Sequence, residues 1–445
     1  MTPIQPMAAA RAHAVTMSDE APVVRVGILG CGTVGSEVVR LLGERADDFA
    51  HRSGARLEIT GIAVRDLETP RGDHVDRALL TTDALAIATS ADIVIELIGG
   101  INPARELVLA ALASGATVVT GNKALLAAHG PELFDAAEAS GADLYYEAAV
   151  AGAVPVVYAL RESLAGDTVT RVLGIVNGTT NYILDEMATK GLDFDTVLAT
   201  AQDLGYAEAD PTADVDGHDA AAKAALLAQL AFHTRVSIDA VSVKGIRDVT
   251  ATAIAQAESA GFALKLLAIA ERVGADAVTV RVAPTLVPLT HPLSSVHGAF
   301  NAVVVESESA GRLMFYGQGA GGAPTASAVL SDLVAAASHK VRGGNAPRES
   351  SYAALRVVGS DETTSAQQAR LHVADQPGVL ARVAGIHADH GVSIESVRQE
   401  TTELGNSIIA IITHPSRVAD LNAVAQELRT DPAVHEVLSV TPVEN

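Results

Sequence analysis

An acidic segment that ends in a lysine has the residue types and spacing for proton chemistry. Residues 205–223 read GYAEADPTADVDGHDAAAK, so five carboxylates precede one lysine. Asp219 and Lys223 are four residues apart and would share one face of a helix. Glu208 and Asp214 lie in the irregular stretch before it. A lysine held by acids suits proton transfer to a substrate oxygen, or capture of an amino acid's ammonium group. A solvated loop with an ordinary surface ion pair is the alternative.

A glycine-rich turn near the N-terminus indicates a nucleotide site. Residues 30–35 read GCGTVG, a G-x-G-x-x-G pattern between an apolar run, Val23–Leu29, and a helix-like stretch. Gly30, Gly32 and Gly35 permit a tight turn and the close approach of a pyrophosphate, which rests on the helix N-terminus. We predict dinucleotide binding here. A glycine turn with only a packing role is the alternative.

Arg65 follows the second apparent strand of this unit. An acidic residue at that position would accept the ribose hydroxyls of NAD, whereas an arginine can pair with a 2′-phosphate. We therefore hypothesise that NADP(H) is preferred over NAD(H). Asp66 next to it, and a merely surface-exposed Arg65, keep the opposite outcome open.

Two other segments follow strands, where doubly wound folds place ligands. Residues 121–123 read GNK, and a lysine at that rim, Lys123, favours a functional role. Residues 177–181 read NGTTN. The N–H groups and hydroxyls of that segment can bind a carboxylate, or it is only a capped helix start.

Residues 147–154 read EAAVAGAV, a short run of small residues after Glu147. A carboxylate beside free carbonyl groups can hold a hard cation. From the residues alone a plain turn is favoured over a cation site.

Apolar runs alternate with helical stretches in the first third of the chain, which predicts right-handed βαβ units in a parallel sheet. The runs are 23–29, 57–64, 92–98, 117–120 and 143–146. From about 155 to 337, longer strands mixed with helices predict an α+β domain, although periodicity does not decide between helix and strand for 261–273. After a Gly- and Pro-containing linker, residues 369–440 spell β-α-β-β-α-β, a ferredoxin-like unit.

Composition excludes several classes of partner. The 445 residues carry 31 Lys+Arg and 53 Asp+Glu, a net charge of −22, which argues against nucleic acid or an anionic membrane. No apolar run reaches the ~18 residues of a membrane span. The single cysteine, Cys31, fits a reducing cytoplasm. Residues 1–22 lack a signal-peptide core and read as a disordered leader, with Met17 as an alternative start.

Taken together, these segments resemble homoserine dehydrogenase, in the monofunctional form that carries a C-terminal ACT domain. The resemblance covers nearly the whole chain from Val23, and the NGTTN and Y-x-E-x-D-P segments are its most specific motifs. Asp375–Leu380, which reads DQPGVL, resembles the ACT signature. The matching segments are 30–35, 121–123, 147–152, 177–181, 205–223 and 317–325.

The resemblance implies reversible NAD(P)-dependent reduction of L-aspartate 4-semialdehyde to L-homoserine, an oxidoreductase step in threonine and methionine biosynthesis. Lys223 would give the proton to the aldehyde oxygen, Asp219 would orient it, and Lys123 would assist. The implied substrate-binding residues are Glu208, Asp214, Gly178 and Thr179; the implied cofactor contacts are Thr33, Val34, Lys123 and Gly321, besides the glycines and Arg65; and the implied structural sodium ligands are Glu147 and the carbonyls of Val150, Gly152 and Val154.

The expected fold is α/β with three domains. A leader (1–22) precedes a Rossmann-type dinucleotide-binding domain (23–152), an α+β substrate and dimerisation domain (153–340), a linker (341–352) and a ferredoxin-like ACT domain (353–445). Extra residues before the ACT unit leave its start open. We expect feedback by L-threonine through the ACT domain, with a purely dimerising module as the alternative. The family also implies a homodimer or homotetramer.

Three rival functions fit less well. Aspartate-semialdehyde dehydrogenase needs a catalytic cysteine, and Cys31 lies in the phosphate turn. Phosphoglycerate dehydrogenase, which can also end in an ACT domain, would place its dinucleotide fold in mid-chain. A non-catalytic amino-acid sensor would have no need to retain both Lys123 and Lys223 with the carboxylate set.

Overall fold

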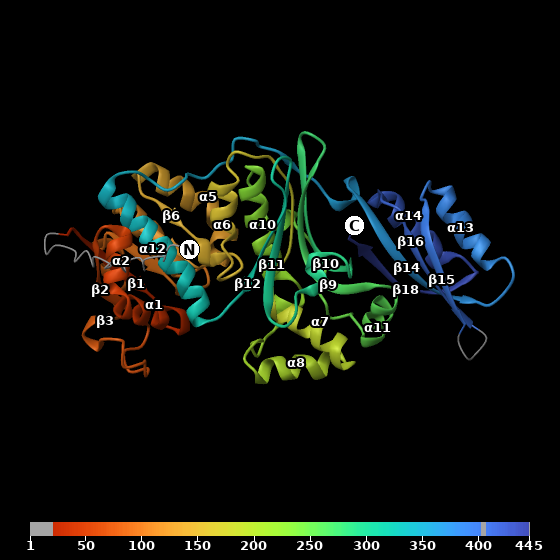
Figure 1. Cartoon of the computed structure of the whole chain (residues 1–445), viewed down its shortest axis with the longest axis horizontal. Coiled ribbons are helices and arrows are strands. Elements are labelled where there is room, and N and C mark those ends of the chain that lie inside the picture. The colour runs from red at the N-terminus through yellow and green to blue at the C-terminus, as the bar shows by residue number, and fades with distance from the viewer. Residues whose placement is uncertain (1–20, 402–405, 445) are drawn as a thin grey trace, which may run out of the picture.

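The computed structural model describes residues 21–401 and 406–444. Three parts of the chain lie in a row along the longest axis, from the N-terminal sheet through a central sheet to the C-terminal unit (Figure 1). The α/β organisation expected from the sequence is confirmed. The expected leader and the alternative start at Met17 fall on residues outside the described range, apart from residues 21 and 22.

Six parallel strands form the N-terminal sheet, in the order β3-β2-β1-β4-β5-β6. Strands β4 and β5 are buried along their whole length, as expected when helices cover both faces of a parallel sheet. The strand order reverses between β1 and β4, so a crevice opens at their carboxyl ends. The strands are β1 (Val23–Leu29), β2 (Arg56–Ala63), β3 (Leu80–Thr81), β4 (Ile93–Glu96), β5 (Thr117–Thr120) and β6 (Leu144–Tyr145).

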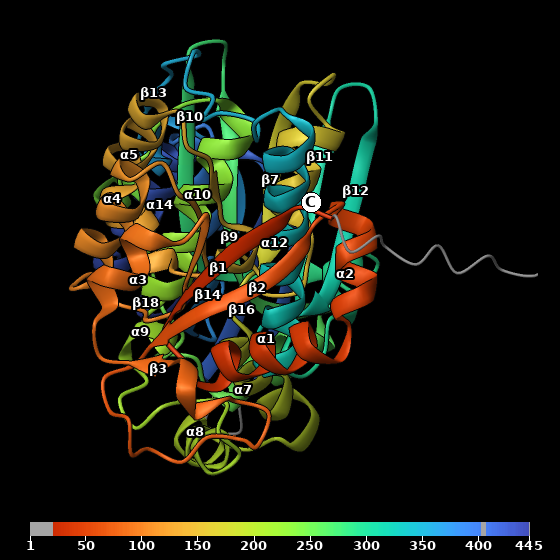
Figure 2. The same ribbon diagram turned by 90° about the vertical axis from the view of Figure 1, so that its left-hand side faces the viewer.

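Helices cover this sheet on two sides (Figure 2). One side carries α1 (Thr33–Glu44), α2 (Ala46–Ser53) and α12 (Gly322–Arg342); the other carries α3 (Ala84–Ser90), α4 (Ala104–Ala113) and α5 (Lys123–Ser140). All but the last two residues of helix α12 fall within the expected second domain, 153–340, yet the helix packs on the first sheet. The reason is its apolar face: Val329 and Leu333 are fully buried in one core with Ile95.

The central part is an antiparallel sheet with strand order β12-β11-β7-β9-β10. Residues 262–273 form a strand, paired along its full length with β10, which resolves the ambiguity left by periodicity. Its strands are β7 (Val169–Ile175), β8 (Ser242–Val243), β9 (Phe262–Val273), β10 (Ala277–Pro288), β11 (Phe300–Ser307) and β12 (Gly311–Gln318), and its helices are α6 (Val156–Tyr158), α7 (Gly178–Lys190), α8 (Phe194–Asp203), α9 (Thr212–Val215), α10 (His218–Phe232) and α11 (Ala251–Ser259).

The C-terminal unit has the expected β-α-β-β-α-β order, with strands arranged β18-β14-β16-β15. Two helices cover one face of this sheet, where Leu371, Ile411 and Leu428 are fully buried. The elements are β14 (Thr364–Ala374), α13 (Val379–Asp389), β15 (Ile394–Thr401), β16 (Asn406–Thr413), β17 (Ser416–Arg417), α14 (Val418–Thr430) and β18 (Val434–Val443).

The central and C-terminal sheets are continuous. Leu286 of β10 pairs with Val443 of β18, and the Glu444 N–H donates to the Leu286 carbonyl at 2.8 Å. The short strand β13 (Arg356–Val357) pairs with β10. Residues 356–357, expected in the ACT domain, therefore belong to the central sheet because their backbone hydrogen bonds are made there. Within the described residues no helix is long and apolar enough to cross a membrane.

Candidate active site

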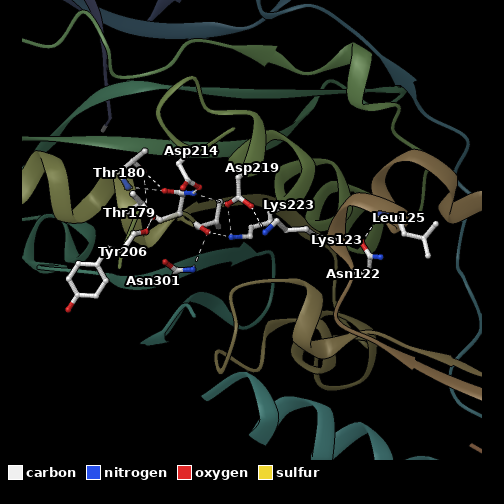
Figure 3. A network of polar contacts seen from close by, with 12 residues as sticks. Asn122, Lys123, Leu125, Thr179, Thr180, Tyr206, Asp214, Asp219, Lys223 and Asn301 are labelled. Carbon is white, nitrogen blue, oxygen red and sulfur yellow. Dashed lines mark hydrogen bonds and ion pairs between the residues drawn. The ribbon is translucent and has the colours of Figure 1, made fainter. Parts of the chain in front are cut away.

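A single buried carboxylate joins two lysines from different parts of the fold (Figure 3). Asp219 lies in the first turn of α10, and Lys223 follows one turn later, with its Nζ 2.8 Å from Asp219 Oδ2. Lys123 is the first residue of α5, and its Nζ lies 2.7 Å from Asp219 Oδ1. The i, i+4 relation expected from the sequence is confirmed, and the pair becomes a Lys–Asp–Lys bridge between the N-terminal and central parts.

The opposite charges in this bridge stabilise one another. Burial opposes ionisation of Asp219, but Lys223 and Lys123 hold the pKa of its carboxyl well below the usual range. Burial alone would lower the pKa of Lys123, whereas Asp219, with smaller contributions from Asp214 and Glu208, raises it overall. Asp219 is therefore ionised and Lys123 protonated at neutral pH.

The NGTTN segment begins α7 and closes the other side of the bridge. The Nδ2 of Asn177 donates to Asp214 Oδ1 at 2.6 Å and to Asp219 Oδ2 at 2.8 Å. Its Oδ1 accepts the Thr180 N–H at 2.8 Å, an N-cap that fixes the amide orientation. Burial, more than any neighbour, raises the pKa of Asp214. The structure thus brings Asp214 and Asp219 onto one amide.

The remaining expected substrate-binding residues surround this point. Gly178 packs so closely on the Ala299 carbonyl that a Cβ would lie 2.6 Å from that oxygen. The Thr179 hydroxyl donates to the Tyr206 carbonyl at 2.6 Å. Glu208 is exposed, and its charge raises the pKa of Lys123, which places it on the same side of the site. All four expected substrate residues therefore converge.

Lys223 has a second acceptor that the sequence gave no reason to expect. Its Nζ donates to the Val176 carbonyl at 2.7 Å, and the same carbonyl accepts Asn301 Nδ2 at 3.1 Å. Asn301 lies on β11 and is fully buried. With Asp219 and Val176 as acceptors, Lys223 keeps one N–H for a ligand. A lone Asn inside an apolar strand was the available signal.

Lys123 is positioned by a buried acid that sequence reasoning also missed. Glu96 ends β4, is fully buried, and accepts the Ile98 N–H at 2.8 Å and the Thr120 hydroxyl at 2.6 Å. Asn122 then caps α5 by accepting the Leu125 N–H at 3.1 Å. These bonds fix the start of α5, and with it Lys123, against the carboxyl edge of the sheet.

The glycine-rich turn borders a cavity of about 770 Å³. Gly30 has φ +99°, and a Cβ on Gly35 would lie 2.3 Å from the Gly30 carbonyl oxygen. Apart from its two chain neighbours, no described residue has an atom within 4 Å of the place where Gly32 would carry a Cβ. Helix α1 has no side-chain cap and no acid in its first turn, so its N–H groups are available to an anion. These residues fit a dinucleotide.

Arg65 and Asp66 both line this cavity, but the carboxylate of Asp66 is engaged within its own loop. It accepts the Glu68 N–H at 2.9 Å and the Thr69 hydroxyl at 2.8 Å. A second arginine, Arg71, also lines the cavity, and its buried Nε has no hydrogen-bond partner among the described residues. The sequence reasoning had not selected Arg71.

Gly321 lies where α12 meets α1. It has φ +130° and caps α12, and a Cβ on the following Gly322 would lie 3.2 Å from Thr33 Cγ2. The first turn of α12 therefore adjoins Thr33 and Val34 at the start of α1, beside the glycine turn. This contact brings together Gly321, Thr33 and Val34, three of the residues that the family resemblance assigns to cofactor binding.

In the candidate sodium segment, Glu147 is engaged with backbone N–H groups. The carboxylate of Glu147 accepts the Val157 N–H at 3.0 Å and the Tyr158 N–H at 2.8 Å, so it caps the following helix. Burial raises the pKa of Glu147 to about 7. Among the described residues no group of three or more His, Cys, Asp or Glu side chains can hold a metal. A cation here would therefore need backbone carbonyl oxygens beside the Glu147 carboxylate.

Family comparisons cover almost the whole chain. The model described as the NAD-binding domain of homoserine dehydrogenase matches residues 30–147, the homoserine dehydrogenase model matches 155–334, and the ACT model matches 368–433. A homoserine dehydrogenase of Corynebacterium glutamicum is 53% identical over 427 residues, covering 95% of this chain and 96% of that protein. One of Mycobacterium tuberculosis is 52% identical over 437 residues, covering 96% and 98%.

Solved structures agree with these relatives. A homoserine dehydrogenase from Thiobacillus denitrificans superposes with a TM-score of 0.90 at 37% identity, covering 96% of this chain and 99% of that one. A hyperthermophilic archaeal homoserine dehydrogenase in complex with NADPH gives a TM-score of 0.61 at 26% identity, covering 73% and 99%. The resemblance drawn from the sequence is confirmed.

The Lys–Asp–Lys bridge makes a prediction about stability. Asp219→Asn should lower the free energy of unfolding by about 3 kcal/mol, at the low end for a broken buried pair because Lys123 is partly exposed. Urea unfolding at about pH 7 measures it, with Asp216→Asn, whose partner Arg247 is on the surface, as the control.

The pH dependence of that difference follows from the depressed pKa of Asp219. A carboxyl with a lowered pKa in the folded state contributes stability above its unfolded value of about 3.9 and loses it as pH falls further. The gap between wild type and Asp219→Asn should therefore shrink once the pH falls below about 4. An equal gap at every pH would contradict the ionised bridge.

Proposed function

The chain belongs to the homoserine dehydrogenase family, and we propose that it reduces L-aspartate 4-semialdehyde to L-homoserine reversibly, with NADP(H) preferred over NAD(H). The observation that carries the proposal is the Lys123–Asp219–Lys223 bridge at the edge of the dinucleotide-binding sheet. An absorbance assay with aspartate semialdehyde and NADPH tests it directly. As a homoserine dehydrogenase, the chain is an oxidoreductase with a nicotinamide-dinucleotide-binding domain.

Proton delivery is assigned to Lys223. A bound nicotinamide would supply or accept the hydride, and reduction would leave alkoxide character on the aldehyde oxygen, which needs a proton. Lys223 uses two donors on Asp219 and Val176, so its remaining N–H is held in a fixed direction. Asp219 orients Lys223 and Lys123 together, and Lys123 replenishes the proton or stabilises the oxygen from the side of the cofactor domain.

The amino-acid end of the substrate is assigned to the neighbouring groups. Glu208 and Asp214 hold its ammonium group. The negative charges of both carboxylates raise the pKa of Lys123, so both lie close enough to this part of the site to attract a positive group. The N–H groups of Gly178 and Thr179 belong to the first turn of α7, where an α-helix has no internal acceptor for them. They hold the substrate carboxylate. The substrate thus lies with its aldehyde toward Lys223.

The cofactor contacts are assigned to the cavity described above. Gly30, Gly32 and Gly35 admit the pyrophosphate to the N-terminus of α1, with Thr33 and Val34 beside it. Gly321 would close the side formed by α12, and Lys123 would contact the nicotinamide end of the cofactor. Arg65 recognises a 2′-phosphate, and the internal bonds of Asp66 remove the residue that would otherwise favour NAD.

We also assign a structural sodium ion to the segment after Glu147. The Glu147 carboxylate, which also accepts two backbone N–H groups, and the carbonyls of Val150, Gly152 and Val154 would supply the oxygens that a hard cation prefers. The domain division is proposed as 23–152 together with α12, then 153–321, with the ACT unit beginning after β13. A homodimer or homotetramer fits the family.

Regulation is assigned to the ACT unit. We propose that L-threonine binds near the turn Asp375–Leu380 and inhibits turnover. The edge strand β15 is exposed along most of its described length and suits side-by-side pairing with a second copy. The C-terminal sheet then transmits the effector signal through its continuity with β10.

Replacing the proton donor should abolish most turnover. Lys223→Ala should lower kcat for semialdehyde reduction by about 10²–10⁴-fold, the usual value of general acid catalysis, while the Kd of NADPH changes little. Steady-state kinetics with cofactor titration measure both. Lys190→Ala, at the exposed end of α7, is the matched control. Near-normal turnover of Lys223→Ala would overturn the assignment.

Replacing the proposed 2′-phosphate contact should change cofactor choice. Arg65→Ala should lower the ratio of kcat/KM for NADPH over NADH by about tenfold or more, because one charge-assisted contact is lost. Parallel assays with the two cofactors give the ratio. Arg52→Ala, an exposed arginine on α2, should leave the ratio as in the wild type. A ratio unchanged in Arg65→Ala contradicts the preference proposed here.

Altering the ACT turn should relieve feedback. Asp375 is exposed in that turn, and Asp375→Ala should raise the L-threonine concentration for half inhibition by about tenfold with basal kcat unchanged. Asp389→Ala, exposed at the far end of α13, is the control. If threonine inhibits wild type and Asp375→Ala alike, the effector binds elsewhere and the ACT unit is a dimerising module.

A further inference from the structure

A second cavity, of about 550 Å³, lies beneath the linker that leads to the ACT unit. Its walls are the C-terminal half of α5, the start of β6, the residues that follow α10, and linker residues 346–355. The catalytic bridge is at the opposite end of α5: Lys123 begins that helix, and Phe134 lies roughly 16 Å further along it at 1.5 Å per residue. The cavity is therefore separate from the active site.

Two almost fully buried polar side chains in this cavity have no hydrogen-bond or ion-pair partner within the described part of the chain. Asp143 is 9% exposed and Tyr146 is 4% exposed, and both line the cavity. No hydrogen bond or ion pair reaches the Asp143 carboxylate or the Tyr146 hydroxyl from the described residues. Both side chains line the cavity, so they are available to a ligand that supplies hydrogen-bond donors.

The charges that remain after internal pairing are of both signs. Arg235 is neutralised by Glu349 and Asp135, each at 2.6 Å. Arg348 is exposed and belongs to no ion pair among the described residues. Arg161 lies with its guanidinium 5.3 Å from the centre of the Tyr146 ring and donates to the Pro347 carbonyl.

The acids and Arg348 come from different segments of the cavity wall. Asp143 and Glu138 come from the end of α5 and the residues after it, whereas Arg348 comes from the linker. Helix α5 ends at Ser140 and α10 at Phe232, both beside the cavity, and helix C-termini favour a positive group. A ligand with an ammonium group at one end and a carboxylate at the other matches this distribution.

We propose that the cavity binds a free α-amino acid as its zwitterion, at a site distinct from both the active site and the ACT turn. Asp143 and Glu138 hold the ammonium group, Arg348 and Arg161 hold the carboxylate, and Tyr146 supplies a hydroxyl between them. The apolar walls at Phe134 and Leu355, with their neighbours, receive the side chain.

Isothermal titration of the full chain with each proteinogenic L-amino acid tests the site. At least one should bind to wild type, and Asp143→Asn and Arg348→Ala should each weaken its Kd by about tenfold, the loss of one charge-assisted contact. The corresponding carboxylic acid without the amino group should not bind. Asp47→Asn, an exposed acid on α2, is the matched control.

Two further comparisons keep the result unambiguous. Asp375→Ala should retain this binding, because the ACT turn is not part of the cavity; loss of binding in that variant instead would overturn the proposal. If Asp143→Asn proves unstable, Arg348→Ala still tests the site, because Arg348 is exposed and its replacement should not affect folding. Failure of every amino acid to bind wild type, or binding equal in wild type, Asp143→Asn and Arg348→Ala, refutes the site and leaves a water-filled gap under the linker.

Discussion

The structure depends on keeping one carboxylate ionised away from water. Asp219 is almost fully buried, and burial alone would drive its pKa upward. Two ammonium groups reverse that, one from its own helix and one from the first residue of α5. Because Lys123 belongs to the dinucleotide-binding part, the bridge can form only when that part and the central sheet are correctly oriented. The electrostatic requirement of the site is thus also a constraint on domain geometry.

The chain passes twice between the N-terminal and central parts, and the close packing of these two connections also fixes the orientation of the parts. A Cβ on Gly152 would lie 2.3 Å from the Gly319 carbonyl oxygen, and the Ala153 N–H donates to the Gln318 carbonyl at 3.0 Å. The two connections therefore run in contact. The Glu147 N–H, just before the first crossing, donates to Asp332 of α12 at 2.9 Å. Helix α12 thereby ties the second crossing back to the first sheet.

Much of this was accessible from the sequence, for physical reasons that differ from element to element. Glycine spacing and an i, i+4 pair are local, so the turn at Gly30 and the Asp219–Lys223 pair could be read directly. The place of α12 could not, because an amphipathic helix does not specify which sheet buries it. Glu96 and Asn301 were missed since a polar residue in an apolar strand acquires its partners only through tertiary contacts. The ambiguity over 262–273 had the same origin: only pairing with β10 made it a strand.

The continuity of the central and C-terminal sheets brings Glu444, which follows β18, into contact with the central strands. Glu444 is buried and forms an ion pair with Arg171 of β7, whose guanidinium also contacts Glu271 of β9. A second arginine, Arg281 of β10, pairs with the same Glu271, so the carboxylate that ends the ACT sheet belongs to a charge network spanning three central strands. Breaking one member of such a network leaves a buried charge unpaired. A displacement of β18 would therefore change the ion pairs made by β7. Val176, whose carbonyl accepts a hydrogen bond from Lys223, directly follows that strand.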